Sequence, residues 1–206
     1  NWKLIIGLTL SVLTSLVIFG GLKKIAKVAT AIVPFMVALY FIAVLVIMFT
    51  NLSGIIPSIK LIFQEAFNFE TAIKGGFWGL VILGVRRAVF SNESGLGSAP
   101  MYHGESKTNE PVQEGLVAML GPFIDTIIVC TLTALTIIIS GAYLEADNNG
   151  IAMTLLAFEK SLFGYGHILL MLIVAAFAMS TLFTYSYYGT KCLTFLTNIK
   201  IGKFFF

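Results

Sequence analysis

Residues 84–100 of this 206-residue chain read Gly-Val-Arg-Arg-Ala-Val-Phe-Ser-Asn-Glu-Ser-Gly-Leu-Gly-Ser-Ala-Pro. The stretch runs from apolar residues through two arginines into a polar, glycine-rich segment that ends at a proline. Most of the sequence around it is strongly apolar. A chain that crosses a bilayer keeps irregular polar backbone only where protein buries it or where it lines a wet cavity. We therefore interpret this segment as a functional part of the protein.

The composition predicts an all-α, polytopic membrane protein. Hydrophobic residues make up 58% of the chain and charged residues only 11%, whereas about a quarter of the residues of a soluble domain are charged. Each of several uncharged windows is long enough to cross ~30 Å of hydrocarbon as a helix. These windows are Leu4–Leu22, Val28–Ile59, Thr126–Leu144 and Ser161–Thr190. The net charge of +3 is spread over loops without a basic patch, so no nucleic-acid partner is expected.

The apolar segments predict five membrane spans in a single transmembrane domain that covers residues 1–206. The tail to Phe206 resembles the start of a sixth span. The expected spans are 3–21, 31–50, 71–93, 112–140 and 166–190. The chain begins with Asn1 and has no cleavable signal pattern. We therefore expect it to be part of a longer protein. Cys130 and Cys192 lie in apolar helical sequence, and buried thiols are favoured over a disulfide.

Lysine and arginine predict the orientation of these spans. The loops 22–30, 86–111 and 191–206 hold nine of the thirteen basic residues. Because basic loops stay in the cytoplasm, the first, third and fifth spans are expected to run inward. The polar segment that precedes Pro100 would then lie at the cytoplasmic edge of a cell membrane.

Glycines weaken the third expected span near its start, at Gly75, Gly76 and Gly79, which flank Phe77. Each glycine costs a helix roughly 1 kcal/mol relative to alanine. A break here would free backbone groups to hold an ion or a carboxylate. Close packing of helices through small residues explains the same pattern equally well.

Asp125 is the only carboxylate well inside an expected span, about 20 Å along a helix that starts near Pro111. An acid inside the membrane is costly and implies a function with a partner. Arg86 or Arg87 could pair with Glu93 or with Asp125 and fix a gate, or both arginines could simply anchor a helix end. A structural ion pair or helix cap is the alternative for Asp125, and coupling to protons is a further one.

The fifth span carries adjacent hydroxyl groups at Ser180 and Thr181, with Tyr185 one helical turn further on. Hydroxyl oxygens are suitable ligands for an ion of the size of sodium. Tyr187 and Tyr188 are interpreted instead as an aromatic belt at the membrane interface.

An intramembrane hydrolase built from Ser91, Glu93 and His103 is conceivable, but no nucleophile-elbow spacing supports it. We therefore expect no enzyme and no cofactor.

Several motifs resemble the alanine or glycine:cation symporter family. The segment from Phe90 to Pro100, Phe-Ser-Asn-Glu-Ser-Gly-Leu-Gly-Ser-Ala-Pro, is similar to that family's signature. Further agreement occurs in order along nearly the whole chain, at 20–26 with 33–36, at 110–115 with 122–126, and at 177–181 with 187–189.

This resemblance implies a partial LeuT-type inverted-repeat bundle of the amino acid–polyamine–cation class, with the third span as its broken helix. It implies sodium binding at Phe177, Ser180 and Thr181, and a large aromatic residue beside the substrate at Tyr185. The substrate would lie between Gly75–Gly79 and the fifth span. The expected gate and signature residues are Arg87, Phe90, Ser91, Asn92, Glu93, Gly95, Gly97 and Asp125.

The expected function is sodium-coupled import of a small neutral amino acid, alanine or glycine, by alternating access. Its partners are the amino acid, sodium and the lipid bilayer. Proton coupling, an ion-only conductor and a transport-inactive receptor on the same helices are the alternatives.

Overall fold

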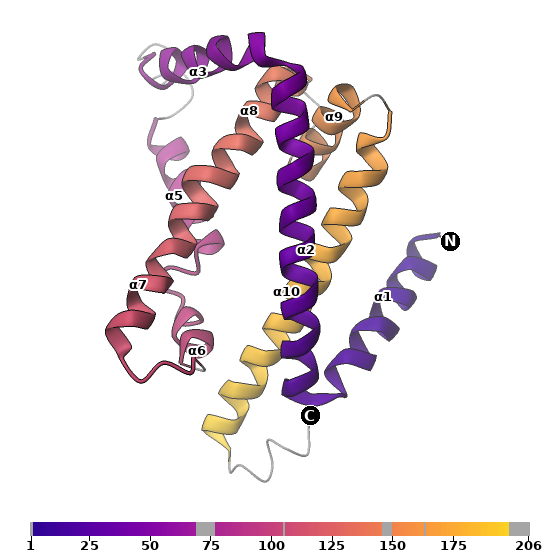
Figure 1. The fold of residues 1–206 in the computed structure, drawn as a ribbon, viewed down its shortest axis with the longest axis vertical. Coiled ribbons are helices and arrows are strands. Elements are labelled where there is room, and N and C mark those ends of the chain that lie inside the picture. Colours follow the sequence, from indigo (N-terminus) through magenta and orange to yellow (C-terminus); the bar gives the residue numbers. More distant parts are fainter. Residues whose placement is uncertain (1, 69–76, 105, 146–149, 163, 198–206) are drawn as a thin grey trace. The chain divides into compact units, whose positions relative to one another are not determined.

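The computed structural model describes residues 2–68, 77–104, 106–145, 150–162 and 164–197 (Figure 1). All regular structure in these residues is helical. The helices are α1 (Trp2–Ile18), α2 (Gly21–Thr50), α3 (Leu52–Ala66), α5 (Phe77–Ser91), α6 (Ala99–His103), α7 (Pro111–Pro122), the π-helix η1 (Phe123–Cys130), α8 (Thr131–Ile139), the short 3₁₀ turn η2 (Ala142–Leu144), α9 (Ile151–Ser161) and α10 (Gly166–Leu196). The prediction of an all-helical protein is confirmed for the described residues.

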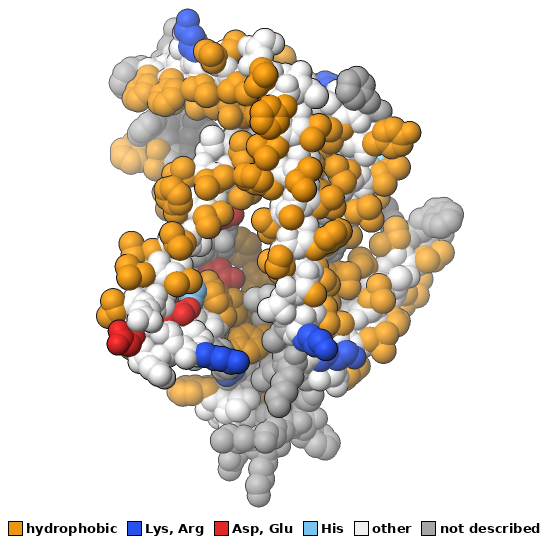
Figure 2. Space-filling model, in the orientation of Figure 1, with side chains coloured by type: hydrophobic (Ala, Val, Ile, Leu, Met, Phe, Trp, Pro, Cys, Tyr) orange, Lys and Arg blue, Asp and Glu red, His pale blue; other side chains and the backbone are white. Residues whose placement is uncertain are grey.

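Three helical stretches are long and apolar enough to cross a membrane, namely Lys27–Thr50, Pro111–Ile139 and Gly166–Leu196. They overlap the expected spans 31–50, 112–140 and 166–190. The apolar part of α1, Leu4–Ile18, is shorter. Figure 2 shows hydrophobic side chains along the visible lengths of α2 and α7, with Lys and Arg side chains near helix ends. This distribution suits helices surrounded by hydrocarbon.

The chain divides into two compact units. The first comprises Asn1–Ile42 and Ile168–Phe206, and the second comprises Ala43–His167. In the first unit, Met36 and Tyr40 of α2 and Ile173 and Phe183 of α10 are buried. These apolar side chains supply the core of that unit.

In the second unit, α3 packs on α8 and α8 packs on α9. Helices α3 and α8 lie close together at Gly54, because a Cβ at this position would lie 3.3 Å from Cγ1 of Ile139. At the start of α10, a Cβ on Gly166 would lie 2.0 Å from the carbonyl oxygen of Phe158. Only glycine fits there without a shift of the backbone.

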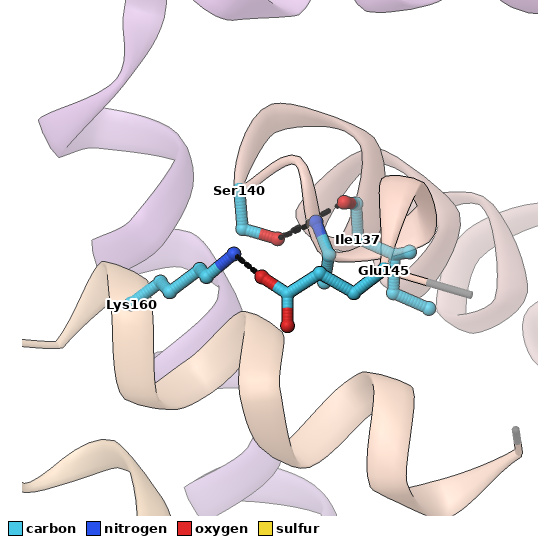
Figure 3. A network of polar contacts seen from close by, with 5 residues as sticks. Ile137, Ser140, Glu145 and Lys160 are labelled. Carbon is cyan, nitrogen blue, oxygen red and sulfur yellow. Dashed lines mark hydrogen bonds and ion pairs between the residues drawn. The ribbon is translucent and has the colours of Figure 1, made fainter. Parts of the chain in front are cut away.

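A polar network closes the turn between α8 and α9 (Figure 3). The hydroxyl of Ser140 donates to the carbonyl of Ile137 at 2.9 Å and accepts from the amide of Ala142 at 3.4 Å. The ammonium group of Lys160 on α9 pairs with the carboxylate of Glu145. The bond from Ser140 satisfies the carbonyl of Ile137, one of the last carbonyls of α8, which lack helical partners.

The two cysteines differ in part from the sequence expectation. Both Cys130 and Cys192 are free thiols, as expected. Both are exposed in this chain, so the expectation of buried thiols was wrong. Apolar sequence predicts that a segment is helical, but it does not distinguish a face that packs on protein from one that does not.

Candidate functional site

Helix α5 does not break at the two glycines that lie within it. It runs continuously from Phe77 to Ser91 through Gly79 and Gly84, and a Cβ at either glycine would meet no atom within 4 Å. The expected interruption is therefore absent at Gly79. Gly75 and Gly76 lie outside the described residues.

The interruption lies instead inside the signature. Helix α5 ends in a Schellman motif, in which the amide of Ser94 donates to the carbonyl of Val89 at 3.0 Å and the amide of Glu93 donates to that of Phe90 at 3.4 Å. Residue Glu93 occupies the left-handed position of this motif, with φ of 52°. Glycine is the usual residue at this position.

Two glycines complete the turn, Gly95 with φ of 76° and Gly97 with φ of 81°. Helix α6 then starts at Ala99 with Pro100 in its first turn, where a missing N–H costs nothing. The middle of the signature, residues 92–98, is therefore a non-helical link between two helices.

Two side-chain bonds join the end of α5 to η1. The hydroxyl of Ser91 donates to Oδ2 of Asp125 at 2.6 Å. The amide of Asn92 donates to Oγ1 of Thr126 at 3.0 Å, and that hydroxyl lies 3.4 Å from Oδ1 of Asn92. The last residue of α5 and the first residue of the link thus bond two consecutive residues of η1.

Asp125 is the middle residue of the span-length helix Pro111–Ile139. The backbone around it forms the π-helix Phe123–Cys130, directly after Pro122. Proline removes one amide from the helical ladder, and π-turns inside α-helices are frequent at functional sites. The widened turn presents Asp125 and Thr126 together toward the end of α5.

At the other end of the signature, Nδ1 of His103 lies 2.6 Å from Oε1 of Glu114 on α7. Ser91 therefore lies level with Asp125, and His103 lies level with Glu114, closer to Pro111. The segment α5–link–α6 runs antiparallel to α7 and η1 (Figure 1). Sequence reasoning did not specify which part of this helix Ser91 would contact, and the structure has Ser91 level with the middle.

Two contacts that the sequence left open, an arginine pair for Asp125 and a hydrolase pair, are absent from the described part of the chain. Among the described residues, no ion pair joins Asp125 to Arg86 or Arg87. Ser91 and His103 bond different partners, so no hydrolase pair forms. His103–Glu114 and Thr126 were missed by sequence reasoning, because no local pattern specifies a contact between separate helices.

Two cavities border the interrupted helix. One, of about 410 Å³, is lined by residues that include Glu93, Gly95, Gly97 and Tyr102. The other, of about 540 Å³, is lined by His103, Ser106 and Glu114 among others. Burial and, to a lesser degree, the negative charge of Glu93 raise the pKa of the Tyr102 phenol, which lies outside the three span-length helices.

The hydroxyls of the fifth span converge on one carbonyl in the first unit. Ser180 Oγ and Thr181 Oγ1 each donate to the carbonyl of Phe177 at 2.9 Å. Ser180 is buried, with Sδ of Met36 4.0 Å from its hydroxyl. Tyr185 is half exposed and lies edge-on to Tyr188. Three oxygen atoms of the expected sodium site are thus close together.

Comparison with known proteins identifies the family of this chain. The sequence profile of the sodium:alanine symporter family matches residues 1–206. The chain belongs to this family. It is 42% identical over 202 residues to the sodium/alanine symporter AgcS of Methanococcus maripaludis. The aligned region covers 96% of this chain and 44% of the relative. The earlier resemblance to alanine or glycine:cation symporters is therefore confirmed.

Two other relatives broaden the comparison. The probable sodium/glutamine symporter GlnT of Bacillus subtilis is 34% identical, over 96% of this chain and 41% of its own length. The sodium/proton-dependent alanine carrier protein of Bacillus sp. PS3 is 29% identical, over 99% of this chain and 49% of its own length. The chain spans less than half the length of these relatives. The family and its named members are transporters, not enzymes.

Proposed function

We propose that this family member is part of a secondary transporter that imports a small neutral amino acid, alanine or glycine, together with sodium. The observation that supports this most is the interrupted helix α5–link–α6, bonded at Ser91 to a carboxylate in the middle of a span-length helix. Transporters that alternate access use such interrupted helices to expose backbone groups to ions and substrates.

Two groups of oxygen atoms are candidate cation sites. The first comprises the Phe177 carbonyl and the hydroxyls of Ser180 and Thr181. The second comprises Ser91, Asn92, Asp125 and Thr126, which combine one carboxylate with neutral oxygens. Hard cations prefer such ligands, and a carboxylate here would compensate the charge of the ion.

Proton coupling is the second candidate, because Asp125 can exchange a proton as well as bind sodium. The Bacillus sp. PS3 relative is named a sodium/proton-dependent alanine carrier protein, which gives this alternative weight. An intramembrane carboxylate is also the usual element of a proton relay.

The proposed substrate contacts are Thr181 and Tyr185 on the fifth span and Gly75, Gly76, Phe77 and Gly79 on the third span. We further propose that the signature, with Arg87 and Phe90 at its start, works the gate on the cytoplasmic side of the cell membrane. This orientation is supported by the basic loops.

The test is the initial rate of labelled alanine uptake into vesicles, with sodium, potassium or a proton gradient as the driving ion. The proposal expects uptake with sodium, and competition by glycine but not by leucine. Equal uptake with potassium would contradict sodium coupling. Uptake driven by protons alone would favour the second candidate, and current without amino acid would favour an ion-only conductor.

A further inference from the structure

Helix α3 carries an exposed apolar strip along one side. The strip, called the α3 strip below, consists of Leu52, Ile56, Ile59 and Phe63. These residues are three or four positions apart, so they lie on one face of the helix. Ile56 is 77% exposed and Phe63 is 62% exposed. A continuous run of large apolar side chains that stays exposed indicates an interaction surface.

The opposite face of α3 packs on the protein. Helix α3 contacts α8, and a Cβ on Gly54 would lie 3.3 Å from Cγ1 of Ile139. Ser58, one helical turn after Gly54, is only 5% exposed. Because a helix turns by about 100° per residue, Gly54 and Ser58 point away from Ile56 and Phe63. The α3 strip is therefore not the face that holds α3 on the protein.

A polar edge lies beside the α3 strip. Ser53, Lys60 and Gln64 are exposed and lie about a quarter of a turn from the strip. Figure 2 shows hydrophobic side chains along the visible side of α3 and a Lys or Arg side chain that projects from its upper edge. Protein, apolar surface and polar groups thus occupy three different sides of this helix. Helices that lie in the plane of a membrane interface have such apolar and polar sides.

Two span-length helices define the depth of α3. The stretch Lys27–Thr50 ends two residues before Leu52, and the stretch Pro111–Ile139 ends against Gly54. Helix α3 lies crosswise to α8, within the same compact unit (Figure 1). The ends of membrane-spanning helices lie near the boundary between hydrocarbon and headgroups. An apolar strip at this level can therefore reach the lipid chains while its polar edge stays in water.

The end of α2 separates α3 from the preceding span. Asn51 has non-helical backbone angles, with φ of −128° and ψ of 40°. Its side-chain amide donates to the carbonyl of Ile47 at 3.0 Å, which satisfies one of the last carbonyls of α2. The chain therefore leaves the span at Asn51, and α3 is a separate helix rather than an extension of α2.

We propose that the α3 strip binds lipid. Helix α3 lies in the plane of the membrane interface, with the strip among the lipid chains and Lys60 toward the headgroups. The four side chains of the strip have no polar atom, whereas protein–protein interfaces contain about one hydrogen bond per 100–200 Å². This composition favours lipid over a protein partner. Loop 22–30 and α3 lie at opposite ends of α2, so the proposed orientation puts α3 at the outer surface.

Spin labels on α3 test this proposal. The variants Ile56→Cys, Phe63→Cys and Gln64→Cys are made in the full-length protein with its other cysteines replaced by serine, and are placed in vesicles of phosphatidylcholine and phosphatidylglycerol. Collisions are measured with oxygen, which concentrates in hydrocarbon, and with a nickel chelate, which stays in water. We expect labels at 56 and 63 to collide mainly with oxygen, about 5–10 Å into the boundary of headgroups and acyl chains. The label at 64 is the matched control and should collide mainly with nickel.

Two results would overturn the proposal. Labels at 56 and 63 that collide mainly with nickel would mean that the strip faces water. Labels there that collide with neither reagent would mean that protein covers the strip. Dilution with unlabelled protein then identifies that cover, because it removes spin–spin broadening only where a second copy lies on the strip.

Lipid cross-linking of the unmodified protein tests the same surface without any variant. A phospholipid with a photoreactive diazirine on its acyl chain is incorporated into the vesicles, and the modified residues are identified by mass spectrometry. We expect modification of the α3 strip and of Phe49, an exposed residue of the neighbouring span, but not of Ser58. Modification of Phe49 without any in the α3 strip would contradict the lipid contact.

Discussion

The hydroxyl of Ser91, the last residue of α5, lies 2.6 Å from Oδ2 of Asp125, the middle residue of the helix Pro111–Ile139. This bond connects the start of the interruption to a carboxylate in the centre of an apolar span. Because a charge in hydrocarbon is stable only with a partner, the pair is a natural place to couple cation binding to helix movement.

Asp125→Asn tests that coupling. The amide still accepts the hydrogen bond from Ser91 but carries no charge, so we expect the sodium concentration for half-maximal uptake to rise roughly tenfold or more. Sodium-dependent uptake of labelled alanine is the measurement. Glu145→Gln, in the pair with Lys160, is the control. A normal sodium dependence in Asp125→Asn would exclude a role for this carboxylate in coupling.

The second candidate cation site gives a separate prediction. Thr181→Ala removes one of the hydroxyls on the Phe177 carbonyl, so we expect weaker activation of uptake by sodium. Thr194→Ala is matched to it, because Thr194 also donates to the carbonyl four residues earlier on α10. If both variants weaken sodium activation equally, the effect is structural and Thr181 has no special role.

The glycines of the link predict an effect on stability. Gly95→Ala places a side chain at φ of 76°, and we expect it to destabilise the protein by about 1 kcal/mol. Gly115→Ala on α7, where a Cβ meets no atom within 4 Å, should stabilise it by up to about 1 kcal/mol. Thermal unfolding in detergent measures both. Equal shifts in the two variants would contradict the left-handed link.

Gly166 gives a prediction about packing. A Cβ there would lie 2.0 Å from the carbonyl oxygen of Phe158, so we expect Gly166→Ala to destabilise by about 1–3 kcal/mol. Gly189→Ala, on the same helix but with no atom within 4 Å of its Cβ, should be neutral or stabilising. The measurement is the unfolding temperature of each variant. An unchanged temperature for Gly166→Ala would mean that Gly166 lies further from the carbonyl of Phe158.

Much of the architecture could be predicted from the sequence. Long uncharged windows indicate helices because hydrocarbon leaves backbone groups no other partner. Pro111 fits the first turn of a helix, and α7 starts there. The family could be predicted from Phe90–Pro100, because this order of polar and small residues is unusual and is similar to the family's signature.

The continuity of α5 through its glycines could not be predicted. Gly79 and Gly84 weaken a helix on average, but α5 passes through both, because glycine permits a break without requiring one. Likewise, no local signal marks Glu93 as left-handed, since the preference there is for glycine. The bonds from Ser91 and Asn92 to η1 depend on how two helices align, which is a tertiary property.

Concentrative uptake tests the central claim most directly. Vesicles that contain the purified protein are given labelled alanine and an inward sodium gradient, and the internal alanine concentration is followed over time. We predict that internal alanine rises above the external concentration and falls back to it when an ionophore collapses the sodium gradient. Internal alanine that never exceeds the external concentration, or an accumulation that persists without the gradient, would contradict sodium-coupled import.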